Sequence, residues 1–163
     1  MADLAITPRD HLGIASVMAR KGVDSEAIGT ALNADMGGGP HAIFTGMRTV
    51  VGTGPGTWLV IEEAASPDYA EALTDALTGL ASVSDQSSAY VVQRLSGSGA
   101  RAVLQRGVAL DLHPEVFRIG MAATTVIAHI GVILWQVDDA PTYDIATSRS
   151  YAGSFRHWLG IGE

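Results

Sequence analysis

Three consecutive runs of strand-forming residues lie near the end of the chain, and they restrict the possible folds more than any other feature. The runs are AATTVIAHI, VILWQV and TYDIATS, joined at Gly131 and at the turn DDAP (residues 138–141). Earlier in the chain, strands alternate with helices, but three strands in succession imply antiparallel pairing. The sequence therefore predicts the α+β class, with helices packed against a mostly antiparallel or mixed sheet.

The first 39 residues are interpreted as a helical extension. Thr7 and Pro8 have the pattern of an N-cap followed by proline, and apolar residues then recur at helical spacing until Gly22. A second short helix is expected over residues 25–35, ended by the run MGGGP. We therefore expect a helical extension over residues 1–39 and a single α+β domain over residues 40–163.

The expected domain begins with two strands, HAIFTGM and TWLVIEE, separated by the turn GTGPG. The cap Ser66-Pro67-Asp68 then starts an amphipathic helix. A strand-like stretch over residues 83–95 is interrupted by the polar residues DQSS. The last helix follows Ser148, and its residues Phe155 and Trp158 are expected to anchor it to the core.

Composition excludes several classes of function. The chain has no cysteine, which excludes disulfide scaffolds and thiolate zinc sites. Ten basic and seventeen acidic residues give a net charge of −7, which disfavours nucleic acid. No apolar run approaches the roughly 18 residues of a membrane span, and no secretory signal is evident. We therefore expect a cytoplasmic protein with neither a nucleic-acid nor a membrane partner.

The charged fraction is 17%, below the roughly 25% of average globular chains. Two explanations are open: a surface rich in Gly, Ser, Thr and Ala, or a surface partly covered by another protein.

Residues 97–102, GSGARA, match the pattern G-x-G-x-x-A between an expected strand and an expected helix. In dinucleotide-binding folds these glycines let the backbone approach a pyrophosphate. Such a site also needs an acidic residue about 20 positions further on, whereas Asp111 comes too early and Asp138 too late. We therefore interpret the glycines as a strand-to-helix turn, with cofactor binding as the alternative.

No group of residues forms an evident active site. Asp111 and His113 could supply two metal ligands, which are too few for a site, and His129 is expected inside a strand. The nucleophile elbow G-x-S-x-G does not occur. We therefore expect no catalytic, cofactor-binding or metal-binding residue on this chain.

Several short patterns occur in order along the chain. They are GPGTWLVI (residues 54–61), SDQSSAYVVQRLSG (residues 84–97), R-G-x-x-LDLHPEVF (residues 106–117), T-x-x-A (residues 125–128) and SRSYA (residues 148–152). Together they resemble the gamma subunit of heterotetrameric sarcosine oxidase, closely over about half of the chain and loosely over its first 50 residues.

The resemblance implies a fold similar to the tetrahydrofolate-binding domain of glycine-cleavage T-proteins. It also implies a complex with larger flavoprotein subunits that oxidatively demethylates sarcosine or another N-methyl amine. In that family FAD, FMN, NAD and tetrahydrofolate belong mainly to the larger subunits, and the gamma chain has no established catalytic residues. We therefore expect a small, non-catalytic subunit with no cofactor of its own.

Contacts with the larger subunits are expected on the loop of residues 111–120. Its residues Leu112, Phe117 and Ile119 lie outside any periodic element, and gathered exposed apolar residues often mark an interaction surface. The alternative for Phe117 is that its ring folds back onto the core. Two other functions stay open: a free-standing folate or one-carbon binding domain, and a pure scaffold protein without a redox partner.

Overall fold

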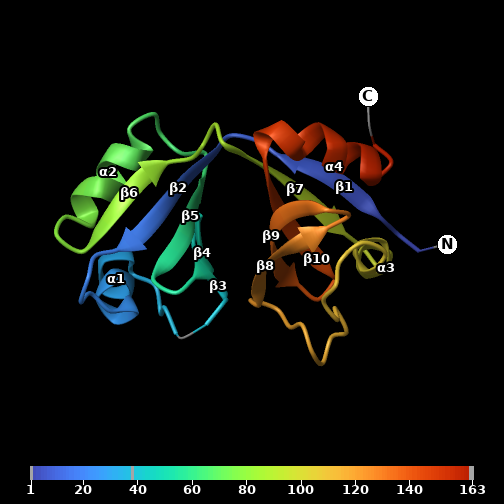
Figure 1. Cartoon of the computed structure of the whole chain (residues 1–163), viewed down its shortest axis with the longest axis horizontal. Coiled ribbons are helices and arrows are strands. Elements are labelled where there is room, and N and C mark those ends of the chain that lie inside the picture. Colours follow the sequence, from blue (N-terminus) through green and yellow to red (C-terminus); the bar gives the residue numbers. More distant parts are fainter. Residues whose placement is uncertain (1, 38, 162–163) are drawn as a thin grey trace. The chain divides into compact units, whose positions relative to one another are not determined.

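The structure is a computed structural model that describes residues 2–37 and 39–161. The chain divides into two compact units, which we call the central unit (His11–Ser87) and the terminal unit (Met1–Asp10 with Ser88–Glu163). Each unit has a five-stranded antiparallel sheet with helices on one face, as Figure 1 shows. The predicted α+β class is confirmed. No helix in the described ranges is long and apolar enough to cross a membrane.

The sheet of the central unit has the strand order β3-β4-β5-β2-β6. Its elements are β2 (Leu12–Ala19), α1 (Ser25–Leu32), β3 (Ala42–Thr45), β4 (Arg48–Gly54), β5 (Thr57–Glu63), α2 (Tyr69–Ala76) and β6 (Ala81–Asp85). Both helices pack on the same face, where Ile28 of α1 and Leu73 of α2 join Val17 and Val60 of the sheet in one apolar core.

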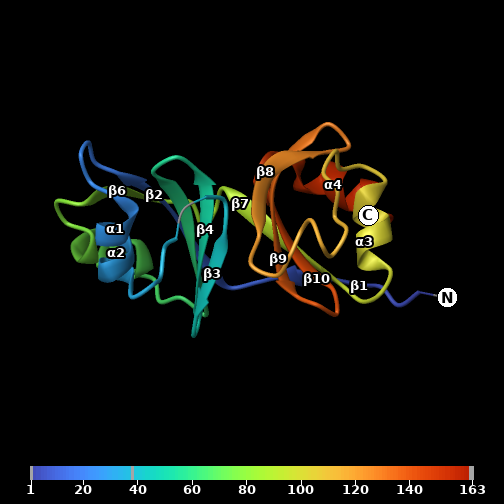
Figure 2. The ribbon, with the colours of Figure 1, turned by 90° about the horizontal axis from the view of Figure 1, so that it is seen from below.

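The sheet of the terminal unit has the strand order β1-β7-β10-β9-β8. Its elements are β1 (Ala5–Arg9), β7 (Tyr90–Ser96), α3 (Ala100–Gln105), β8 (Ala122–Ile127), β9 (Ile130–Asp138), β10 (Thr142–Ser148), a 3-10 turn (Arg149–Tyr151) and α4 (Ala152–Trp158). Figure 2 shows α3 and α4 beside this sheet. Phe155 is fully buried in the core of the unit, and Trp158 is half-buried against its ring at 6.0 Å between centroids.

The same order of elements, β-β-α-β-β-β-α, occurs twice along the chain. The first copy runs from β1 to α2 and the second from β6 to α4. The first strand of each copy belongs to the sheet of the other copy, because β1 pairs with β7 and β6 pairs with β2. The fifth strand of each sheet is therefore exchanged between the two copies.

The predicted helical extension is wrong over its first half. Residues 5–9 and 12–19 form the strands β1 and β2, and only the second expected helix exists, as α1. Ile14, Ala15 and Val17 of β2 are all buried, and a strand buried on both faces gives a continuous apolar run that periodicity does not separate from a helix. The compact units also do not follow the expected boundary between residues 39 and 40.

The other expected strands and helices are present with two differences. The strand β4 was not expected, because its sequence RTVVGTG ends in residues that were interpreted as a turn. The strands β8 and β9 meet at Ala128 and His129 rather than at Gly131, and both residues have left-handed φ angles, of 48° and 69°. His129 is therefore exposed at a hairpin turn and does not lie inside a strand.

Candidate functional site

A buried carboxylate with two arginines is the most polar group inside the terminal unit. Asp144 of β10 is only 1% exposed. Its Oδ1 accepts a hydrogen bond from Nε of Arg94 at 2.7 Å, and its Oδ2 accepts one from Nη2 of Arg94 at 2.8 Å. Nη1 of Arg9 on β1 also donates to Oδ2 at 2.8 Å. The Asp144 carboxylate thus joins three strands, β1, β7 and β10.

This ion cluster is suited to holding strands together. A bidentate arginine contact is strong and geometrically specific, and hydrogen bonding by Asp144 raises the pKa of Arg94 above its ordinary value. The oxygens of the carboxylate already accept three charged hydrogen bonds, which leaves little capacity for a ligand. Sequence analysis did not identify this cluster, although a charged residue inside the apolar strand TYDIATS was a signal for it.

The glycine-rich residues 97–102 form the turn that leads from β7 into α3, as the preferred interpretation predicts. Gly97 has a left-handed φ of 106°, whereas Gly99 has an ordinary φ of −87°. The backbone N–H of Gly99 donates to the carbonyl oxygen of Asp3 at 2.7 Å. A segment from the beginning of the chain therefore occupies the place beside these glycines.

The loop of residues 111–120 differs from the expectation at two of its three candidate contact residues. Leu112 and Phe117 are both buried in the core of the terminal unit, and the Phe117 ring lies 6.5 Å from that of Tyr143 between centroids. The alternative for Phe117, a ring folded back onto the core, is the arrangement in the structure. Moving an apolar side chain from water into the core lowers its free energy, so the buried Leu112 and Phe117 anchor the loop.

Ile119 is the candidate that lies at the surface, and its neighbour in the loop, Val116, joins it there. Each of them is 53% exposed. The loop that carries them is fixed by α3, because Nε of Arg101 donates to the carbonyl oxygen of Leu112 at 2.8 Å and Oε1 of Gln105 accepts from the N–H of Leu112 at 3.0 Å. The loop thus presents two apolar side chains on a fixed backbone.

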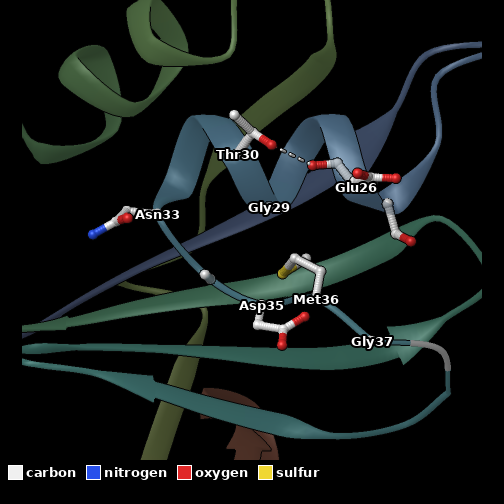
Figure 3. A pocket seen from close by; sticks show the side chains of 9 residues that line it. Glu26, Gly29, Thr30, Asn33, Asp35, Met36 and Gly37 are labelled. Carbon is white, nitrogen blue, oxygen red and sulfur yellow. Dashed lines mark hydrogen bonds between the residues drawn. The ribbon is translucent and has the colours of Figure 1, made fainter.

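The central unit contains a pocket of about 660 Å³ between α1 and the segment that follows it. Gly29 brings this segment close to the helix, since a Cβ there would lie 2.5 Å from the carbonyl oxygen of Ala34. Figure 3 shows the carboxylates of Glu26 and Asp35 pointing apart, while the Thr30 hydroxyl donates to the backbone carbonyl of Glu26 at 3.0 Å. The polar groups of the pocket therefore do not converge on one point.

A second pocket of about 460 Å³ lies beside the turn between β3 and β4. Its charged groups are Arg48 and Glu62, which form an ion pair at 3.1 Å on the surface of the sheet. Within residues 2–37 and 39–161, no group of three or more histidine, aspartate or glutamate side chains could hold a metal ion.

Comparison with protein families gives one clear result. The model of the family described as sarcosine oxidase, gamma subunit, matches residues 25–162. The chain belongs to this family. It is 33% identical over 144 residues to sarcosine oxidase subunit gamma of Corynebacterium sp. strain P-1, and 30% identical over 154 residues to that of strain U-96. These matches cover 83% and 91% of this chain but 65% and 72% of the relatives, so the chain spans about two thirds of their length.

Two solved structures have a similar fold. A chain of the heterotetrameric sarcosine oxidase from Corynebacterium sp. U-96, in complex with pyrrole 2-carboxylate, matches 96% of this chain and 81% of its own length with a TM-score of 0.84 and 25% identity. The glycine cleavage system aminomethyltransferase T from Bartonella henselae matches 99% of this chain and 47% of its own length with a TM-score of 0.71 and 14% identity. The expected likeness to the T-protein fold is confirmed.

Proposed function

We propose that this chain is the small, non-catalytic gamma subunit of a heteromeric flavoenzyme complex of the sarcosine oxidase type. The proposed complex oxidatively demethylates sarcosine or a related N-methyl amine in the cytoplasm. FAD, FMN, NAD and tetrahydrofolate are assigned to the larger subunits. The main support is the similarity of 96% of the chain, at a TM-score of 0.84, to a chain of a heterotetrameric sarcosine oxidase.

The loop of residues 111–120 is our candidate for a contact with a larger subunit. Val116 and Ile119 are exposed apolar side chains on a backbone that Leu112 and Phe117 fix from below. A loop that is already ordered loses little conformational entropy when it binds, which favours such a loop as a docking element. Ile119 therefore remains a proposed contact, and Val116 is added to it.

The alternative of a free-standing folate-binding domain would need a carboxylate that can accept hydrogen bonds from the pterin ring. Among the described residues of the terminal unit, Asp144 is the buried carboxylate, and its oxygens are engaged by Arg9 and Arg94. This arrangement favours the subunit over the folate-binding domain. A folate titration of the purified chain tests this alternative, and genes for large flavoproteins beside this gene would argue against a pure scaffold.

Co-expression with the larger subunits tests the proposal. We expect one stable complex that carries flavin, and we expect Ile119→Asp to weaken assembly while the free chain keeps its melting temperature. Met47→Asp is the matched control, because Met47 is 56% exposed but belongs to the central unit. If the wild-type chain stays separate from the larger subunits, the proposed function is wrong. If the wild-type chain assembles and the Ile119→Asp variant assembles equally well, the proposed function stands and only the assignment of the contact loop is wrong.

A further inference from the structure

The turn Gly97–Gly99 and the strand β7 together bind residues 2–9 of the chain, and we call the two together the segment site. Residues 5–9 lie along β7 in antiparallel register, from Ala5 opposite Ser96 to Arg9 opposite Val92. Residues 2–4 continue past the end of β7 and lie against the turn, because the N–H of Asp3 donates to Oγ of Ser98 at 3.1 Å and its carbonyl oxygen accepts from the N–H of Gly99 at 2.7 Å.

The two glycines leave space for this segment. A Cβ at Gly97 would lie 2.5 Å from the carbonyl oxygen of Asp3, and a Cβ at Gly99 would lie 3.1 Å from the same oxygen. Real carbon atoms do not approach an oxygen as closely as the first of these distances, so any larger residue at Gly97 would displace the segment. The glycine-rich residues 97–102, which match a phosphate-binding pattern, thus leave space here for the backbone of residues 2–4.

The segment is bound mainly through groups that any extended peptide would offer. Asp3 is held by its backbone N–H and carbonyl, and the next residues are held by a β-ladder. Two side chains add specificity: Ile6 packs against the core of the terminal unit, and Arg9 pairs with Asp144. Strand addition to a sheet edge, with backbone hydrogen bonds for affinity and side chains for specificity, is a common mode of peptide recognition.

We propose that the segment site is a binding site for an extended peptide, that residues 2–9 are its tethered ligand, and that a free peptide of the same sequence can replace them. The tether is short, because only Asp10 and His11 separate β1 from β2, and it therefore gives the segment a high effective concentration. A free peptide must compete with the tethered segment for the same site. It can bind there when the interactions of the tethered segment are weakened.

The test uses the full chain and a synthetic peptide of residues 1–11, with the bound fraction measured by native mass spectrometry. The full-length variant Ile6→Ala weakens only the tethered copy, since the peptide keeps its isoleucine. We expect this variant to hold about tenfold more peptide than the wild-type chain at the same peptide concentration. If neither chain holds peptide while both remain folded, the segment is not exchangeable and the proposal is wrong.

Two altered peptides locate the binding without changing the protein. A peptide with Asp3→Pro lacks the N–H that Ser98 accepts and should bind about tenfold more weakly, whereas a peptide with Asp3→Ala keeps both backbone groups and should bind as the wild-type peptide does. Equal binding of the proline and alanine peptides would overturn the assignment of the segment site.

A change in the segment site completes the test. In the Ile6→Ala chain, adding Gly99→Ala should weaken peptide binding, because the new Cβ would lie 3.1 Å from the carbonyl oxygen of Asp3, which would have to shift. Adding Gly153→Ala is the matched control, since a Cβ at Gly153 meets no atom within 4 Å. Undiminished binding with Gly99→Ala would show that the peptide binds elsewhere on the chain.

Discussion

The central and terminal units have the same order of elements but stabilise their sheets differently. The central unit has an apolar core, in which the hydroxyl of Tyr69 donates to the carbonyl oxygen of Val60. Among the described residues, the buried glutamine, threonine and aspartate side chains all belong to the terminal unit: Gln93, Gln136, Thr142, Asp144 and Thr147. One topology is therefore compatible with a core of either kind.

The difference follows the origin of the fifth strand. In the central unit the fifth strand, β6, lies directly after α2 in the chain and packs against this helix. In the terminal unit the fifth strand, β1, comes from the opposite end of the sequence, and Arg9 at its end pairs with Asp144 of β10. No helix of the described residues lies next to β1 in the sequence, and the Arg9–Asp144 ion pair instead links this strand to β10.

The largest predicted difference between the units concerns their ion pairs. Asp144→Ala should lower the free energy of unfolding by about 3 kcal/mol, because it removes the buried carboxylate that Arg9 and Arg94 share. Glu62→Ala is the matched change in the central unit and should cost less than about 1 kcal/mol, since Arg48 and Glu62 are partly exposed. Urea unfolding of both variants measures the contrast, and equal losses would contradict it.

The second contrast concerns one buried tyrosine in each unit. Tyr69→Phe should cost about 1 kcal/mol, because it removes the hydrogen bond to Val60. Among the described residues the Tyr143 hydroxyl has no hydrogen-bond partner of good geometry, so Tyr143→Phe should change stability little. Thermal unfolding of the two variants compares them, and a larger loss for Tyr143→Phe would reverse the assignment.

The same tyrosines predict how stability depends on pH. Burial raises the pKa of both phenols, opposed by Arg48 at Tyr69 and by Arg101 at Tyr143. Near pH 10 the two phenols release their protons in the unfolded chain but keep them in the folded chain. Their contribution to the free energy of unfolding is therefore fully present below about pH 10 and is lost as the pH rises further. When urea unfolding is measured at several alkaline pH values, the free energy of unfolding should fall less steeply with pH for Tyr69→Phe than for the wild type.

The smallest contrast concerns two equivalent hairpins. The turn between β3 and β4 uses Gly46 at a φ of 59°, whereas the turn between β8 and β9 uses Ala128 at a φ of 48°. Ala128→Gly should stabilise the chain by about 1 kcal/mol, and Gly46→Ala should destabilise it by a similar amount, because only glycine adopts this region without strain. Changes of the same sign in both variants would contradict this explanation.

Local patterns predicted the elements that local physics determines. The helix α2 was predicted from the pattern Ser-Pro-Asp at residues 66–68 and an apolar stripe, although its N-cap, Asp68, makes no side-chain capping hydrogen bond. The strands β8 to β10 were predicted from β-forming runs separated by turn residues. The strand β2 was mistaken for a helix because residues on both of its faces are buried, and its place in the sheet between β5 and β6 is set by tertiary structure.

The ion cluster could not be predicted for a different reason. Asp144 is separated from Arg94 by 50 residues and from Arg9 by 135 residues, so no spacing in the sequence relates the three. The glycine-rich turn was placed correctly, but its occupant, the segment around Asp3, comes from 95 residues earlier in the chain. Contacts of such long range depend on the strand order, which the sequence alone did not reveal.

The exchange of first strands also orders events during synthesis on the ribosome. The central unit is contiguous in sequence, so its sheet can form once the residues up to Ser87 have emerged. The strand β1 is made before β7, its neighbour in the sheet, and stays unpaired until β7 has been made. During this interval it is an unpaired strand, and Pro8 and Arg9 are residues that protect such strands from pairing with other nascent chains.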